Sequence, residues 1–93
     1  MNIELDIEGV TDRAITVAIT KRVRNLGRQI DRPEKWRVTL AQSEVRGVWD
    51  LGIHTARGWH LASFTSTLAL LPDVVERTLR ERLTAPMPDY AGT

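Results

Sequence analysis

The sequence predicts an α+β fold with the element order β-α-β-β-β-α, in which a four-stranded mixed sheet has two helices packed on one face. Four short segments alternate apolar and polar residues, which is the period-two pattern of half-buried strands. Two longer segments carry apolar residues at steps of three and four, which is typical of amphipathic helices. A helix with a single apolar stripe suits one-sided covering of a sheet, so both helices are expected on the same face.

The first part of the chain predicts a strand, a helix and a second strand. Residues 3–8 alternate isoleucine or leucine with acids. Thr11 is expected to be the N-cap of the helix, with Asp12 in its first turn. Pro33 ends the helix because proline disfavours helical geometry at the residue before it. A second strand covers residues 36–40. The apolar stripe of the helix comprises Ile15, Ile19, Val23, Leu26 and Ile30.

The middle of the chain predicts a hairpin of two strands, over residues 49–54 and 59–64. We expect a three-residue loop over residues 56–58, because this register pairs Ile53 with Leu61 and keeps apolar side chains on one face. The alternation then predicts which aromatic side chains are buried. Core positions are expected for Trp36, Trp49 and Trp59, and open-face positions for Ala62 and Phe64.

The end of the chain predicts a second helix that begins at Pro72, a residue tolerated in the first helical turn. Its stripe consists of Leu71, Val75, Leu79 and Leu83. Residues 85–93 hold two prolines and a glycine without an apolar period, and they predict a C-terminal tail. A chain of 93 residues builds one core, so we expect a single domain over residues 1–84.

The composition excludes several classes of function. The chain has no cysteine, which excludes disulfides, thiolate zinc sites, iron–sulfur ligation and a cysteine nucleophile. There is no apolar run of about 18 residues and no signal-peptide pattern at the start, so a cytoplasmic protein is expected. No nucleophile elbow or glycine-rich phosphate loop is present, and we expect neither catalysis nor a cofactor.

Two histidines and an aspartate are the candidate metal ligands. The expected hairpin register places His54 and His60 opposite each other, with Asp50 on the same face. Imidazole is a common metal ligand, so a metal site is one interpretation. The spacing is not a recognised ligand motif, and exposed strand histidines are the favoured interpretation, with no metal expected.

Basic charge is concentrated in one quarter of the chain. Residues 1–12 carry four acids and no base, whereas residues 13–37 carry eight bases and two acids, a local charge of +6. A localised basic patch favours a polyanionic partner, because neutralised phosphates release their counterions. On a helical wheel the basic residues lie opposite the apolar stripe, at Arg13, Lys21, Arg24 and Arg28, with Val17 between them.

Three segments carry a resemblance to a known family. They are residues 7–11 (IEGVT) before the basic helix, residues 57–62 (RGWHLA) in the hairpin, and residues 74–83 (VVERTLRERL) in the last helix. With the element order, they resemble the bacterial ribosome hibernation factors, namely hibernation-promoting factor and ribosome-associated inhibitor. The resemblance implies a stress-response protein that occupies small-subunit ribosomal RNA and regulates translation without catalysis. The residues expected to bind RNA are Arg13, Lys21, Arg22, Arg24, Arg28, Arg32 and Arg37.

An interaction domain is the alternative interpretation. The sheet face that no helix covers, with Phe64, Ala62 and Val48, or an edge strand could dock a protein partner or a second copy in a homodimer. The two interpretations differ in salt dependence. Phosphate binding weakens steeply with salt, whereas apolar docking does not.

Overall fold

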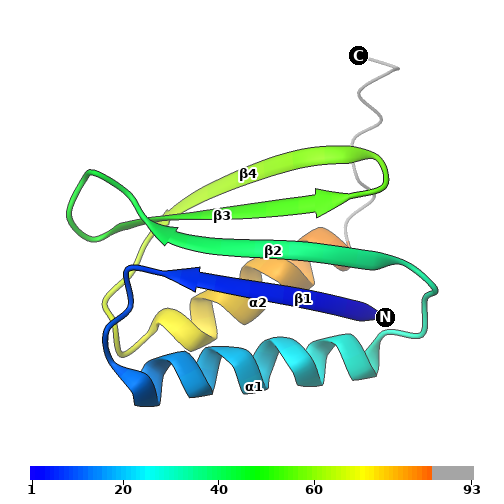
Figure 1. Ribbon diagram of the computed structural model, residues 1–93, viewed down its shortest axis with the longest axis horizontal. Helices are drawn as coiled ribbons and strands as arrows, with labels where there is room; N and C mark the ends of the chain where they lie inside the picture. Colours follow the sequence, from blue (N-terminus) through cyan, green and yellow to red (C-terminus); the bar gives the residue numbers. More distant parts are fainter. Residues whose placement is uncertain (85–93) are drawn as a thin grey trace.

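The computed structural model describes residues 1–84, and its elements follow the predicted order (Figure 1). The tail predicted for residues 85–93 lies outside the described residues. The elements are β1 (Asn2–Glu8), α1 (Arg13–Gln29), β2 (Lys35–Gln42), β3 (Val48–Thr55), β4 (Gly58–Thr65) and α2 (Leu71–Thr84). Neither helix is long and apolar enough to cross a membrane.

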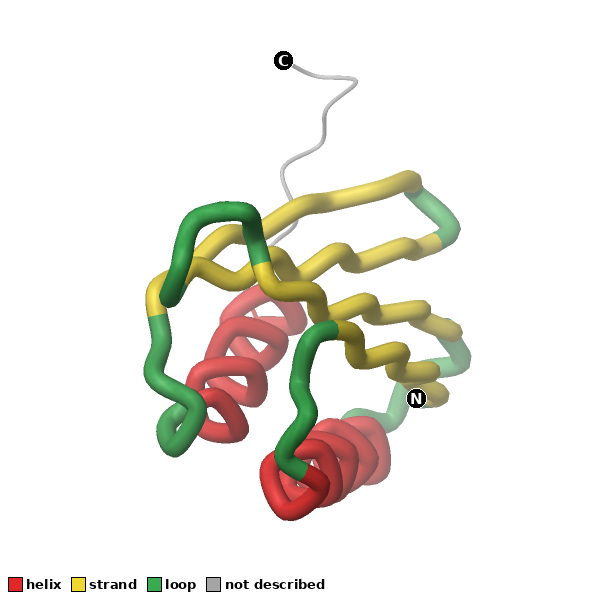
Figure 2. Tube along the Cα trace, turned by 60° about the vertical axis from the view of Figure 1, so that its left-hand side comes forward, coloured by secondary structure: helices red, strands yellow, loops and turns green. Residues whose placement is uncertain are grey.

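The four strands form one mixed sheet in the order β1-β2-β3-β4. β1 and β2 are parallel and are connected through α1, whereas the β2–β3 and β3–β4 pairs are antiparallel. Both helices lie on the same side of the sheet (Figures 1 and 2). The predicted α+β fold is therefore confirmed. No helix of residues 1–84 covers the opposite face of the sheet, which is called the open face below.

The core lies between the sheet and the helices. Alternate residues of β2 and β3 point into it, and the stripes predicted for α1 and α2 face them. The fully or nearly fully buried side chains are Ile19, Val23, Leu26, Trp36, Val38, Leu40, Trp49, Leu51, Ile53, Leu71, Val75, Leu79 and Leu83. Ile15 and Ile30, at the ends of the α1 stripe, are only partly buried against this core.

The hairpin register differs from the prediction by one residue. Ile53 pairs with His60 and Thr55 with Gly58, so the loop contains two residues rather than three. Such a slip moves every side chain of a strand to the other face. Two-residue loops are the commonest hairpin connections, and Gly58 has the positive φ of 128° that glycine adopts readily.

The slip reverses the predicted faces of β4. Trp59 and Leu61 lie on the open face and are 56% and 58% exposed, so the predicted core position of Trp59 is wrong. Ala62 and Phe64, predicted to be on the open face, instead pack against the core. Gly52 explains how the open face accommodates an indole. A Cβ built on Gly52 would lie 2.2 Å from the ring of Trp59, so only glycine leaves room for the ring there.

The N-cap of α1 is Asp12 rather than Thr11. A capping side chain must reach the amides of the second or third helical residue. The Asp12 carboxylate does so, because it accepts hydrogen bonds from the backbone N–H groups of Ala14 (2.9 Å) and Ile15 (3.3 Å). The predicted cap was therefore one residue too early.

Asp12→Ala should lower the free energy of unfolding by about 1 kcal/mol, because two amides at the start of α1 lose their acceptor. Urea denaturation followed by circular dichroism measures this loss. Thr11→Ala is the matched control, since no cap hydrogen bond involves Thr11. A larger loss for Thr11→Ala than for Asp12→Ala would contradict the assignment of the cap.

Candidate nucleic-acid interface

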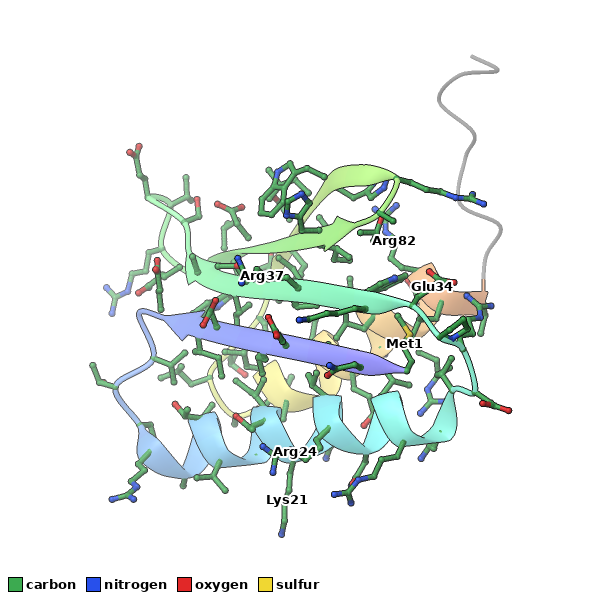
Figure 3. All side chains as sticks on the ribbon, turned by 45° about the vertical axis from the view of Figure 1, so that its right-hand side comes forward. Met1, Lys21, Arg24, Glu34, Arg37 and Arg82 are labelled. Carbon is green, nitrogen blue, oxygen red and sulfur yellow. The ribbon has the colours of Figure 1, made fainter. Side chains whose placement is uncertain are left out.

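The solvent side of α1 carries a row of basic residues. The helix has five basic residues and no acid, and its buried stripe fixes which of them face solvent. Four lie within an arc of about 80° on the exposed side, at about 100° per residue. They are Arg13, Lys21, Arg24 and Arg28, named the α1 basic face below, and all are exposed. Figure 3 shows Lys21 extending from α1 away from the sheet.

The side chains of the α1 basic face have no charged partner within ion-pair distance among residues 1–84. None of its four side chains forms an ion pair or a side-chain hydrogen bond with any residue in that range. They spread over 16 residues of helix, which corresponds to about 22 Å along the axis. The surface therefore offers a line of cations that an extended polyanion could follow.

Two other predicted RNA-binding residues contact α2. Arg22 forms an ion pair with Asp73, and its Nη1 lies 3.7 Å from a carboxylate oxygen of Glu76. Arg32 donates a hydrogen bond from Nη2 to the carbonyl oxygen of Leu83 at 3.1 Å, in the last turn of α2. Arg22 thus connects α2 to α1, and Arg32 connects α2 to the loop that follows α1. Both guanidinium groups already have partners within the protein.

Arg37 lies on the other side of the sheet. It is the neighbour of buried Trp36 and Val38 in β2, so it points to the open face. Its guanidinium lies 3.5 Å from Glu4, which also accepts from Lys35 Nζ at 2.9 Å. Lys35 first, and Arg37 second, hold the pKa of the Glu4 carboxyl below its ordinary 4.5, so Glu4 is charged at neutral pH.

A groove lies beside the C-terminal part of the α1 basic face. Its volume is about 630 Å³, and it is bounded by the start of β1, the last turns of α1 and the loop before β2. Arg24, Arg28 and Arg32 line it together with Glu34. Three guanidinium groups against one carboxylate leave the groove electropositive. It therefore extends the electropositive surface from the helix toward the edge of the sheet.

The predicted arrangement of His54, His60 and Asp50 on one face is wrong. The one-residue slip buries His60 on the helix side, whereas His54 is exposed on the open face. Asp50 accepts a hydrogen bond from the Ser63 hydroxyl at 2.8 Å. Within residues 1–84, no group of three His, Cys, Asp or Glu side chains is placed to hold a metal ion.

The sequence prediction missed the exposure of Trp59, the largest side chain on the open face. Its ring meets His54 edge-on, with centroids 5.7 Å apart and an interplanar angle of 79°. The signal that could have revealed it is Gly52, a glycine in the middle of a strand, which often marks the close approach of another group.

Comparison with known proteins identifies no matching family model and no matching curated protein. Among solved structures, the chain is similar to the N-terminal domain of Thermus thermophilus protein Y, with a TM-score of 0.43 and 18% identity over 84% of this chain and 99% of that chain. It is also similar to a ribosomal subunit interface protein from Coxiella burnetii, with a TM-score of 0.46 and 18% identity over 91% of this chain and 100% of that chain.

Proposed function

We propose that this chain is a cytoplasmic, ribosome-associated protein that binds RNA of the small ribosomal subunit through the α1 basic face. It would act by occupying the RNA surface, as a hibernation factor does, and not by catalysis. The observation that carries the proposal is the row of four exposed cations that form no ion pair with a described residue. The ribosomal target follows from the sequence resemblance described above.

The row of cations suits phosphates repeated along an extended polyanion. Arginine donates paired hydrogen bonds that match phosphate oxygens, and three of the four residues are arginines. Each neutralised phosphate releases counterions, which drives association without a change in protein conformation. Arg22 and Arg32 would contribute mainly by holding α2 in place, because their charges are shared with other groups. Arg37 points to the open face, but it also lines a pocket at the β1 edge together with Arg24, so RNA that passes from α1 around this edge would reach it.

Co-sedimentation with isolated ribosomal subunits tests the proposal. The protein should pellet with small subunits at low salt and return to the supernatant as the salt concentration rises. Pelleting with large subunits alone would contradict the assignment of the small subunit. Retention in the supernatant with both subunits at low salt would contradict ribosome association altogether.

Self-association is the second candidate, and one observation favours it. Trp59 and Leu61 are exposed beside each other in alternate positions of β4, which is an edge strand of the sheet. Exposed apolar residues on an edge strand can pair with a second copy. Sedimentation equilibrium of the free protein distinguishes this candidate, because an apolar homodimer would persist at high salt.

A further inference from the structure

The open face holds an aromatic ring in a defined position. The six-membered ring of Trp59 covers Gly52, since a Cβ at that glycine would lie 2.2 Å from its Cη2 atom. The edge contact with His54 supports the ring from the neighbouring strand. Trp59 nevertheless remains 56% exposed. The indole is thus fixed against the sheet backbone while much of its surface is available to a flat ligand.

Cationic side chains lie on the same face as this ring, on the far side of His54. The strand register places Arg37 next to His54, which is in turn next to Trp59. A small hollow of about 220 Å³ lies beside Arg37 and His54, and Glu4, Lys35 and Thr55 complete its lining. Both cations share a single carboxylate, that of Glu4, so the cluster keeps a positive charge. Arg57, in the hairpin loop before Trp59, adds another exposed cation.

Acidic groups occupy the opposite end of the same face. Asp6 pairs in the sheet with Thr39, one row beyond the Arg37 row. Glu8 and Asp50 both lie beside Ala41, one row further still. An anionic ligand would be repelled from that end and attracted to the end that carries Lys35, Arg37 and Trp59. The charge pattern therefore favours a short anionic ligand with a planar group.

We propose that the open face binds unpaired nucleotides of RNA, with one base stacked on Trp59 and the adjacent phosphates held by Arg37 and Lys35. This inference shares the RNA partner with the proposed function but uses the other face of the sheet. Stacking on an exposed aromatic ring is the common mode of single-strand recognition, and it tolerates any base because every base has a π face. The protein would then contact RNA on two sides, through phosphates at α1 and through a base at β4.

A short single-stranded oligonucleotide is the appropriate probe. Trp36 and Trp49 are only 2% and 3% exposed, so quenching of intrinsic fluorescence by hexauridylate should report on Trp59. Affinities of the variants are measured at low salt from the anisotropy of fluorescein-labelled hexauridylate. Trp59→Leu should weaken binding about tenfold, whereas Trp59→Phe should retain most of it. Gly52→Ala should also weaken binding, because its methyl group displaces the ring from the sheet.

Leu61→Ala is the matched control, since Leu61 is equally exposed on the same strand but offers no π face. It should leave the affinity unchanged. Circular dichroism and the emission of buried Trp36 and Trp49 verify that each variant folds. Equal affinities of wild type and Trp59→Leu, or no binding of hexauridylate by wild type, would overturn the inference. So would a wild-type dimer that Trp59→Leu converts to a monomer, because a second copy would then cover the ring.

The two RNA proposals can fail separately. Gln replacements of Arg13, Lys21 and Arg28 leave Trp59 and its neighbours unchanged, because these residues lie on α1 on the other side of the sheet. Arg24 is kept in this variant, because it lines a pocket at the β1 edge together with Arg37. That triple variant should bind hexauridylate nearly as tightly as wild type. If it loses ribosomal RNA but keeps the oligonucleotide, both proposals are supported. If hexauridylate binding is lost in the triple variant but kept in Trp59→Leu, the open-face site is wrong.

Discussion

Ile19→Ala should lower the free energy of unfolding by about 2–5 kcal/mol. Ile19 is fully buried on the side of α1 that faces the sheet, and its truncation leaves a cavity among core residues. Small domains are stable by only about 5–15 kcal/mol, so this single change removes a large part of the total. Urea denaturation at 25 °C, followed by circular dichroism, measures the loss.

Val17→Ala is the control for this effect. Val17 is in the same helix but on its solvent side, where it is 52% exposed. Its truncation removes little buried surface, and alanine favours a helix more than valine does. The expected change is within about 0.5 kcal/mol. Similar losses for the two variants would contradict the packing of α1 on the sheet.

Replacement of Lys21, Arg24 and Arg28 by Gln should flatten the salt dependence of binding to small-subunit RNA. Each cation that neutralises a phosphate adds about 0.7–0.9 to the slope of log affinity against log salt concentration, so three replacements should reduce the slope by about 2–3 units. The midpoint of thermal unfolding should stay the same, because these side chains form no ion pair or side-chain hydrogen bond with residues 1–84.

A triple variant with the same net charge controls for the overall field of the protein. Gln at Arg46, Arg77 and Arg80 also removes three positive charges, but from the β2–β3 loop and from α2. It should keep most of the wild-type slope. An equal reduction in both triple variants would show that binding depends on net charge and not on the α1 basic face.

The fold could be predicted because its clearest sequence patterns extend over long segments. The stripe of α1 repeats over a helix of 17 residues, and no other periodicity fits it. The register of β4 was not predictable in the same way. Apolar residues occupy both alternation phases of this strand, since Trp59 and Leu61 compete with Ala62 and Phe64 for the core. Loop length and the space above Gly52 decide between the phases, and neither is visible in the alternation.

The sequence likewise predicts one part of the candidate site and not the other. The position of Arg13, Lys21, Arg24 and Arg28 opposite the stripe follows from helix geometry alone. The contacts of Arg22 and Arg32 cannot be predicted from helix geometry, because their partners lie about 50 residues later in the sequence, in α2. A helical wheel shows which residues share a side of one element. It does not show that Asp73 or the Leu83 carbonyl will lie beside that side after folding.

The measurement that tests the central claim most directly is the salt dependence of wild-type affinity for small-subunit ribosomal RNA. Four cations on the α1 basic face predict a slope of about −3 or steeper in log affinity against log salt concentration. A slope near zero, or no binding at low salt, would contradict the claim that this face binds RNA through phosphates.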